Sequence, residues 1–123
     1  MEKRVLAIGL DPSCADFSAF PGLSPELVRN YIDAQIKRLD AAGFITESCL
    51  IDRGDTAVQV VARVLQSRQF DCVVIGAGLR EPPDLLVLFE QVLNLVHRLV
   101  PSARICFNTT PADTLEAVQR WMK

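Results

Sequence analysis

One short run, residues 72–76 (Cys-Val-Val-Ile-Gly), constrains the fold more than any other part of the sequence. The run carries no charge and is rich in β-branched side chains, which is typical of a strand buried on both faces. Strands of this kind occur in parallel sheets that are covered by helices above and below. The run therefore predicts a central strand of a parallel sheet.

A Gly-x-Gly pair, Gly76 and Gly78, ends this strand, and a single positive charge, Arg80, follows. Glycine lets the chain turn sharply or lets a ligand approach the backbone. Residues 76–80 are therefore predicted to form a flexible, basic loop at the carboxyl end of a central strand, where open α/β sheets bind ligands.

Strand and helix patterns alternate along the whole chain. The predicted strands are residues 4–9, 44–51, 72–76 and 104–107, and the predicted helices are residues 25–42, about 56–68, about 83–99 and from about 111 onward. Strict alternation implies a parallel sheet with right-handed crossovers. We predict one three-layer, doubly wound α/β domain over residues 1–123, with helices on both faces, strand order 2-1-3-4, and the more polar second strand at an edge.

This pattern resembles that of flavodoxin-like and receiver-type α/β domains, which are Rossmann-like folds, although it has one strand fewer. The resemblance implies fold more than function, because such folds host many activities. In receiver domains the phosphorylated aspartate follows the third strand, where this chain has residues 76–78, and the expected lysine beside the last strand is replaced by residues 108–110. A flavodoxin-type phosphate loop after the first strand is not matched by residues 10–13 either. These departures argue against phosphoryl-aspartate signalling and flavin binding.

The composition excludes several classes of partner. The formal charge is −2 and the pI is about 5.3, which argues against a nucleic-acid-binding surface. No segment approaches an uncharged membrane span, so we expect a cytoplasmic protein without membrane contact. The glycine spacing fits neither a dinucleotide fingerprint nor a P-loop, and we expect no cofactor.

The cysteines do not form a metal-binding pattern. None of the four (Cys14, Cys49, Cys72 and Cys106) belongs to a C-x-x-C pair, and the chain has one histidine, so no zinc site is expected. Three of the four fall in predicted strands and are expected to be buried, reduced thiols. Cys14 falls in a loop, where it is either a reactive thiol or a bystander.

Polar residues follow three of the predicted strands, and parallel strands one, three and four would bring them to one edge of the sheet. They are Asp11 and Ser13, then Gly76, Gly78 and Arg80, and finally Asn108, Thr109 and Thr110. Backbone amides and an arginine fork can together bind an anion. Asp11 is the candidate catalytic residue, either as a base or by holding Arg80 or a metal ion. In the alternative interpretation these side chains only satisfy loop amides, Thr110 and Asp113 form a capping box, and Arg80 is solvated.

Two functions remain open at this stage. In the first, the chain binds a small phosphate- or carboxylate-bearing molecule, with transfer or hydrolysis of that molecule left open. In the second, it is a receiver-like interaction module that acts through its third predicted helix. The run 85–89 in that helix is apolar around nearly the whole circumference. We therefore expect a homodimer formed through this helix.

Overall fold

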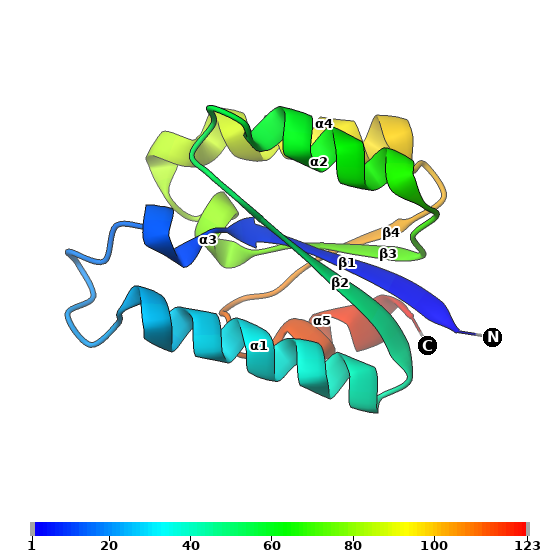
Figure 1. The fold of residues 1–123 in the computed structure, drawn as a ribbon, viewed down its shortest axis with the longest axis horizontal. Helices are drawn as coiled ribbons and strands as arrows, with labels where there is room; N and C mark the ends of the chain where they lie inside the picture. The colour runs from blue at the N-terminus through cyan, green and yellow to red at the C-terminus, as the bar shows by residue number, and fades with distance from the viewer. Residues whose placement is uncertain (1, 123) are drawn as a thin grey trace.

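The computed structural model describes residues 2–122 and shows four parallel strands between two layers of helices (Figure 1). The strands are β1 (Lys3–Leu10), β2 (Phe44–Ile51), β3 (Cys72–Ile75) and β4 (Arg104–Phe107). They lie in the order β2-β1-β3-β4, with every neighbouring pair parallel. The predicted three-layer α/β class, the strand order and the edge position of β2 are confirmed.

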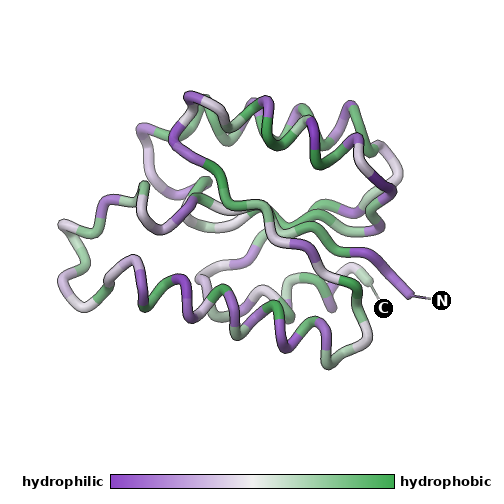
Figure 2. The backbone as a smooth tube through the Cα atoms, in the orientation of Figure 1, coloured by the Kyte–Doolittle hydropathy of each residue, from purple (hydrophilic) through white to green (hydrophobic). Residues whose placement is uncertain are grey.

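The helices divide evenly between the two faces of the sheet. Helices α1 (Pro25–Ala41) and α5 (Thr114–Trp121) cover one face, and α2 (Ala57–Ser67) and α4 (Leu86–Leu99) cover the other. Two cores result, because alternate residues of each strand point to opposite faces. On β1, Leu6 and Ile8 join the core under α2 and α4, and Val5 joins the core under α5. Figure 2 shows hydrophobic stretches along the strands and along α2 and α4, and hydrophilic residues at the start of β1.

The predicted limits of α1 are confirmed by its contacts. Ser24 caps the helix, since its Oγ accepts a hydrogen bond from the Leu27 amide at 3.1 Å. Pro25 occupies the first turn, where its missing N–H costs nothing. Gly43 follows the helix with a φ of +96°, a left-handed conformation that side chains other than glycine rarely adopt.

Two local predictions are wrong. Residues 76–80 do not form a flexible loop, because Ala77–Arg80 is a one-turn helix, α3, that packs against β1 and α4. The capping box at the final helix is also absent: α5 begins after Asp113, whose side chain makes no cap hydrogen bond to the helix. Two 3₁₀ turns complete the chain, η1 (Pro12–Cys14) and η2 (Pro83–Leu85).

The apolar run at the start of α4 is largely covered within the chain. Leu88, Val92 and Val96 are buried, and the helix packs against α2 as well as against the sheet. Leu86 and Val87 stay exposed, by 53% and 65%. The second apolar face of this helix, which suggested a dimer, thus packs mainly within the same chain. The exposed apolar surface of α4 is smaller than the sequence indicates.

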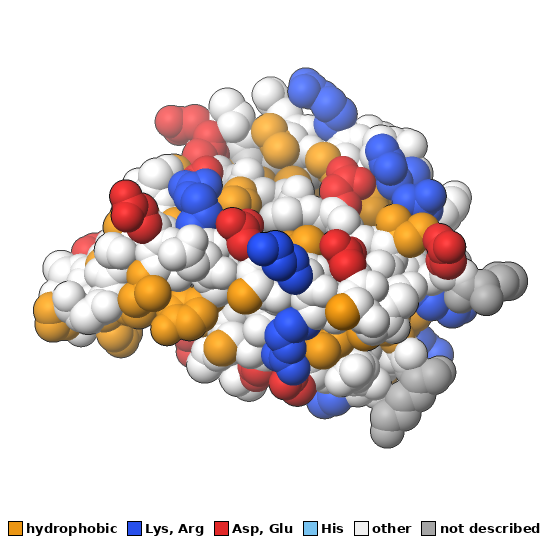
Figure 3. All heavy atoms as spheres, turned by 60° about the horizontal axis from the view of Figure 1, so that its bottom comes forward, with side chains coloured by type: hydrophobic (Ala, Val, Ile, Leu, Met, Phe, Trp, Pro, Cys, Tyr) orange, Lys and Arg blue, Asp and Glu red, His pale blue; other side chains and the backbone are white. Residues whose placement is uncertain are grey.

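The surface on the side of α1 and α5 carries interspersed acidic and basic side chains, with no broad area of one sign (Figure 3). Hydrophobic side chains gather at the end where the chain passes from β1 to α1; Phe20 and Leu23 of this segment are exposed. Among residues 2–122, no helix has the length and apolar character required to cross a bilayer.

Candidate functional site

A cleft of about 100 Å³ lies between α1 and the sheet, where the carboxyl ends of β1 and β3 meet. Helix α1 leaves β1 toward β2, and the chain after β3 leads the other way toward β4, so this is the switch point of the sheet. The walls are mostly apolar. The lining residues include Val28, Ile32 and Ile36 of α1, Ala7 and Gly9 of β1, Leu50 of β2, and Gly76, Ala77, Gly78 and Asn108 at the strand ends.

The cleft exists because β1 turns small residues toward α1. Ala7 and Gly9 follow Val5 on this face. The side chain of Ala7 is a single methyl group and Gly9 has no side chain, whereas larger residues of β1 face α2 and α4. A Cβ atom added at Gly9 would lie 3.6 Å from Leu50 Cδ2, which is ordinary contact distance. The void is therefore a consequence of the small side chains at Ala7 and Gly9, and a methyl group at Gly9 would fit into it.

Asn108 connects β4 to α3 and α5 at the edge of the cleft. Its side chain is 7% exposed, and its Oδ1 accepts a hydrogen bond from the Ala77 amide at 2.8 Å. Its Nδ2 donates to Thr114 Oγ1 at 3.1 Å. The first amide of α3 therefore already donates its hydrogen bond to Asn108. This amide was one of the groups that the sequence suggested for anion binding.

Arg80 is bound to backbone oxygens and lies outside the cleft lining. Its Nη1 donates to the Ile75 carbonyl at 3.0 Å and its Nη2 to the Asn108 carbonyl at 2.6 Å. The guanidinium also lies over Phe107, with Cζ 5.0 Å from the ring centroid. Burial lowers the pKa of Arg80 from its ordinary value, but arginine stays charged in proteins. These contacts join β3, α3 and β4, and they contradict the picture of a solvated loop arginine.

Asp11 and Ser13 form a local turn with Arg29 of α1. Asp11 Oδ1 accepts from the Ser13 amide at 3.0 Å, from Ser13 Oγ at 2.8 Å and from Arg29 Nη2 at 2.9 Å. The hydrogen bonds from Ser13, and then the charge of Arg29, hold the pKa of Asp11 below its ordinary value. A general base works best with a pKa near the operating pH, so Asp11 is poorly tuned for that role.

Thr109 and Thr110 belong to a turn organised by Asp113. The Asp113 carboxylate accepts hydrogen bonds from both threonine amides and from Thr109 Oγ1. Partial burial alone would raise the pKa of Asp113, but these hydrogen bonds outweigh it and hold the pKa below its ordinary value. Thr110 Oγ1 accepts from the Ala112 amide at 3.0 Å and does not cap α5.

The structure thus places the predicted residues at one edge of the sheet, but they do not all line the same cleft. Gly76, Gly78 and Asn108 line the cleft. The other predicted residues, Asp11, Ser13, Arg80, Thr109 and Thr110, are not among its lining residues. Anion binding by the full set remains a prediction.

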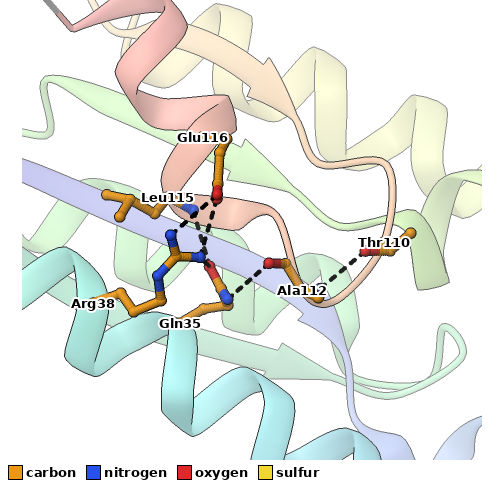
Figure 4. Close-up of polar contacts among 6 residues, drawn as sticks. All are labelled: Gln35, Arg38, Thr110, Ala112, Leu115 and Glu116. Carbon is orange, nitrogen blue, oxygen red and sulfur yellow. Dashed lines mark hydrogen bonds and ion pairs between the residues drawn. The ribbon is translucent and has the colours of Figure 1, made fainter.

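Gln35 is a residue that the sequence analysis missed. It is 6% exposed and lines the cleft. Figure 4 shows its side chain reaching from α1 to the start of α5. Its Nε2 donates to the Ala112 carbonyl at 2.9 Å, and its Oε1 accepts from the Leu115 amide at 3.1 Å. Gln35 therefore caps α5 from a neighbouring helix, in place of the predicted capping box. A polar residue within the apolar stripe of α1 was the available signal.

Arg53 was also missed, because it falls in a turn. Its Nη1 donates to the Cys14 carbonyl at 3.1 Å, and its Nη2 pairs with the Asp84 carboxylate. It therefore connects three loops at the carboxyl edge of the sheet. The ion pair is exposed, and such pairs stabilise proteins by about 0–1 kcal/mol.

Three cysteines, Cys49, Cys72 and Cys106, are buried, so their sulfur atoms are shielded from solvent, although the hydrogen bond with Cys72 lowers the pKa of Cys106. Burial raises the pKa of Cys49 to about 11. Cys72 and Cys106 lie on neighbouring strands with their sulfur atoms 3.6 Å apart, and the hydrogen bond to Cys106, together with burial, raises the pKa of Cys72. Cys14 is half-buried beside Ser13. Within residues 2–122 no group of three His, Cys, Asp or Glu side chains is placed to hold a metal ion.

The carboxylates at this edge predict a loss of stability in acid. Hydrogen bonds lower the pKa values of Asp11, Asp52 and Asp113 in the folded chain, so the unfolded chain binds more protons as the pH falls below about 4. The stabilisation is present above the unfolded pKa and is lost as the pH falls through the lower folded values. Urea unfolding between pH 6 and pH 2.5 should show a steep decline below pH 4.

Asp113→Asn should make that decline shallower. Asp33→Asn is the matched control, since Asp33 is exposed on α1 and its side chain makes no hydrogen bond or ion pair within residues 2–122. Equal pH profiles for the wild type and Asp113→Asn would contradict the role given to this carboxylate.

The chain matches no protein-family model and no curated protein sequence, so its function has to be inferred from its own residues.

Proposed function

We propose that the protein binds a small molecule that has a narrow apolar part and an anionic group, either phosphate or carboxylate, at the carboxyl ends of β1, β3 and β4. The cleft at the switch point of the sheet is the observation that carries this proposal. Catalysis by transfer or hydrolysis is not part of the proposal, because Asp11, the candidate base, is bonded to Ser13 and Arg29 and does not line the cleft.

The size and walls of the cleft favour an apolar group of modest size. A dry cavity of about 150 Å³ is able to hold a benzene ring. The present cleft is about 100 Å³ and opens to the surface, so it suits a partly inserted ring or a short chain. Val28, Ile32 and Leu50 supply the apolar contacts.

The anionic group would lie at the mouth of the cleft, among the loops that follow the strands. Thr110 and Ser13 carry hydroxyl groups there, and Arg29 adds a positive charge at the start of α1. Arg29 is paired with Asp11, so we expect the anion to compete for this guanidinium.

Phenyl phosphate is a suitable probe, because it joins one ring to one phosphate. We expect millimolar phenyl phosphate to raise the melting temperature more than inorganic phosphate does, and to shift the amide resonances of Gly9, Gly76 and Asn108. A concentration of about 10 mM is high enough to detect binding with a millimolar Kd. If neither compound shifts these resonances at that concentration, the proposal is wrong.

Gly9→Ala tests whether the cleft is the site. The new methyl group points into the cleft near Leu50. It should stabilise the unliganded fold by about 0.4–1 kcal/mol, because alanine restricts the unfolded chain. It should also weaken phenyl phosphate binding by about tenfold, equal to about 1.4 kcal/mol. Calorimetry and urea unfolding measure the two effects.

Gly22→Ala is the matched control. A Cβ atom at Gly22 meets nothing within 4 Å, and this residue lies in the loop before α1. The affinity for phenyl phosphate should therefore not change. Equal affinities for wild type, Gly9→Ala and Gly22→Ala would place any binding outside the cleft.

A second candidate function is protein association through α4, the third helix of the sequence analysis. The exposed Leu86 and Val87 at its start favour this interpretation.

A further inference from the structure

The outer face of α4 forms one wall of a shallow groove beside α2. The groove has a volume of about 430 Å³, and its lining residues are Val58 of α2 and Val87, Glu90, Gln91, Asn94, Leu95 and Arg98 of α4. Val87 is 65% exposed, the highest value among the exposed large hydrophobic side chains of residues 2–122. The groove lies on the side of the sheet opposite the cleft.

The charges on this face are arranged symmetrically about Asn94. Glu90 precedes Asn94 by four residues and Arg98 follows it by four, so each lies about 6 Å from Asn94 along the helix axis. Neither charged side chain forms an ion pair within residues 2–122. Asn94 is flat against its own helix, because its Nδ2 donates to the Glu90 carbonyl at 2.8 Å.

We propose that α4 binds α4 of a second copy of this chain in antiparallel orientation, with the two-fold axis beside Asn94. In this arrangement Glu90 of each copy lies level with Arg98 of the other, and the two ion pairs are identical by symmetry. A parallel arrangement would instead set Glu90 level with Glu90. The occupant of the groove is a second copy because the face is complementary in charge to itself.

An exposed apolar side chain lies toward each end of the interface. Val87 lies seven residues before Asn94 on the same helix and is 65% exposed. Antiparallel pairing therefore sets Val87 of each copy near the carboxyl end of α4 of the other. This interface is independent of the proposed ligand cleft, so each proposal can fail without the other.

Charge reversal is the direct test. Sedimentation equilibrium of the wild type should show a mass that rises from 13.6 kDa toward twice that value as the concentration increases. Glu90→Arg and Arg98→Glu should each weaken dimerisation by about tenfold or more, because each change replaces two attractions with two repulsions. The double variant Glu90→Arg with Arg98→Glu should regain most of the wild-type affinity.

Lys37→Glu is the control, since Lys37 is exposed on α1 at the opposite face of the sheet. It should not change the dimer affinity, and circular dichroism should show that every variant is folded. A wild type that keeps the monomer mass up to millimolar concentration would overturn the proposal. So would single reversals that leave the dimer intact, or a double variant that stays as weak as the single ones.

Discussion

Arg80→Ala should lower the free energy of unfolding by about 3 kcal/mol, the largest effect expected of any surface-reaching arginine in this chain. The substitution removes the hydrogen bonds to the carbonyls of Ile75 and Asn108 and the contact with the Phe107 ring. Hydrogen bonds to charged groups contribute about 1.5–3 kcal/mol each. The two carbonyl oxygens that would lose their donor lie in a partly buried site. Urea unfolding at neutral pH measures the loss.

Arg80→Lys should recover only part of the stability, because an ammonium group lacks the planar fork that reaches two carbonyls at once. Arg63→Ala is the matched control, because Arg63 is exposed on α2 and its side chain makes no hydrogen bond or ion pair within residues 2–122. Its effect should stay within about 0.5 kcal/mol. If Arg80→Ala were equally mild, Arg80 would not join the strand ends and would again be a candidate for anion binding.

The layers of this fold follow from patterns that are local in the sequence. Runs such as residues 72–75 are short and apolar because β3 is buried on both sides. Strict alternation with helices then leaves a parallel sheet as the simplest arrangement. Ser24 and Gly43 mark the ends of α1 because, at this helix, the capping contacts are made with residues next to them in the sequence.

The details at the strand ends could not be derived in the same way. Gly76 and Gly78 suggested a loop, yet Ala77–Arg80 forms a helical turn because Asn108, thirty-one residues away from Ala77, accepts its amide hydrogen bond. Arg80 was predicted to bind an anion, or in the alternative to be solvated, because its acceptors in the fold are backbone carbonyls, which every residue possesses and no sequence pattern marks. Contacts of this kind depend on the tertiary fold.

The candidate cleft also has one property that the sequence predicts and another that depends on the tertiary fold. Its position at the carboxyl ends of β1 and β3 follows from the strand order, which the sequence predicts. Its walls depend on which face of β1 carries Ala7 and Gly9, and on the α1 residues opposite them. A narrow apolar void results where the residue types alone suggested a polar anion site.

Gln35→Leu should lower the free energy of unfolding by about 2–4 kcal/mol, because it leaves the buried Leu115 amide and the partly buried Ala112 carbonyl without this partner. The Leu115 amide and the Ala112 carbonyl both bond to this one side chain (Figure 4). Leucine has a similar volume, so the loss measures the hydrogen bonds more than packing. The Leu115 amide should also exchange with solvent faster, since the first turn of α5 loses its cap.

Gln59→Leu provides the matched control, since Gln59 is exposed on α2 and its side chain makes no hydrogen bond within residues 2–122. Its effect should be within about 0.5 kcal/mol. Gln35 also lines the cleft, and the Ala112 carbonyl that it holds adjoins Pro111, another lining residue. Gln35→Leu should therefore alter the amide resonances of Gly9 and Gly76 across the cleft, while Gln59→Leu leaves them unchanged. A stable Gln35→Leu variant with unshifted resonances would show that α5 and the cleft do not depend on this cap.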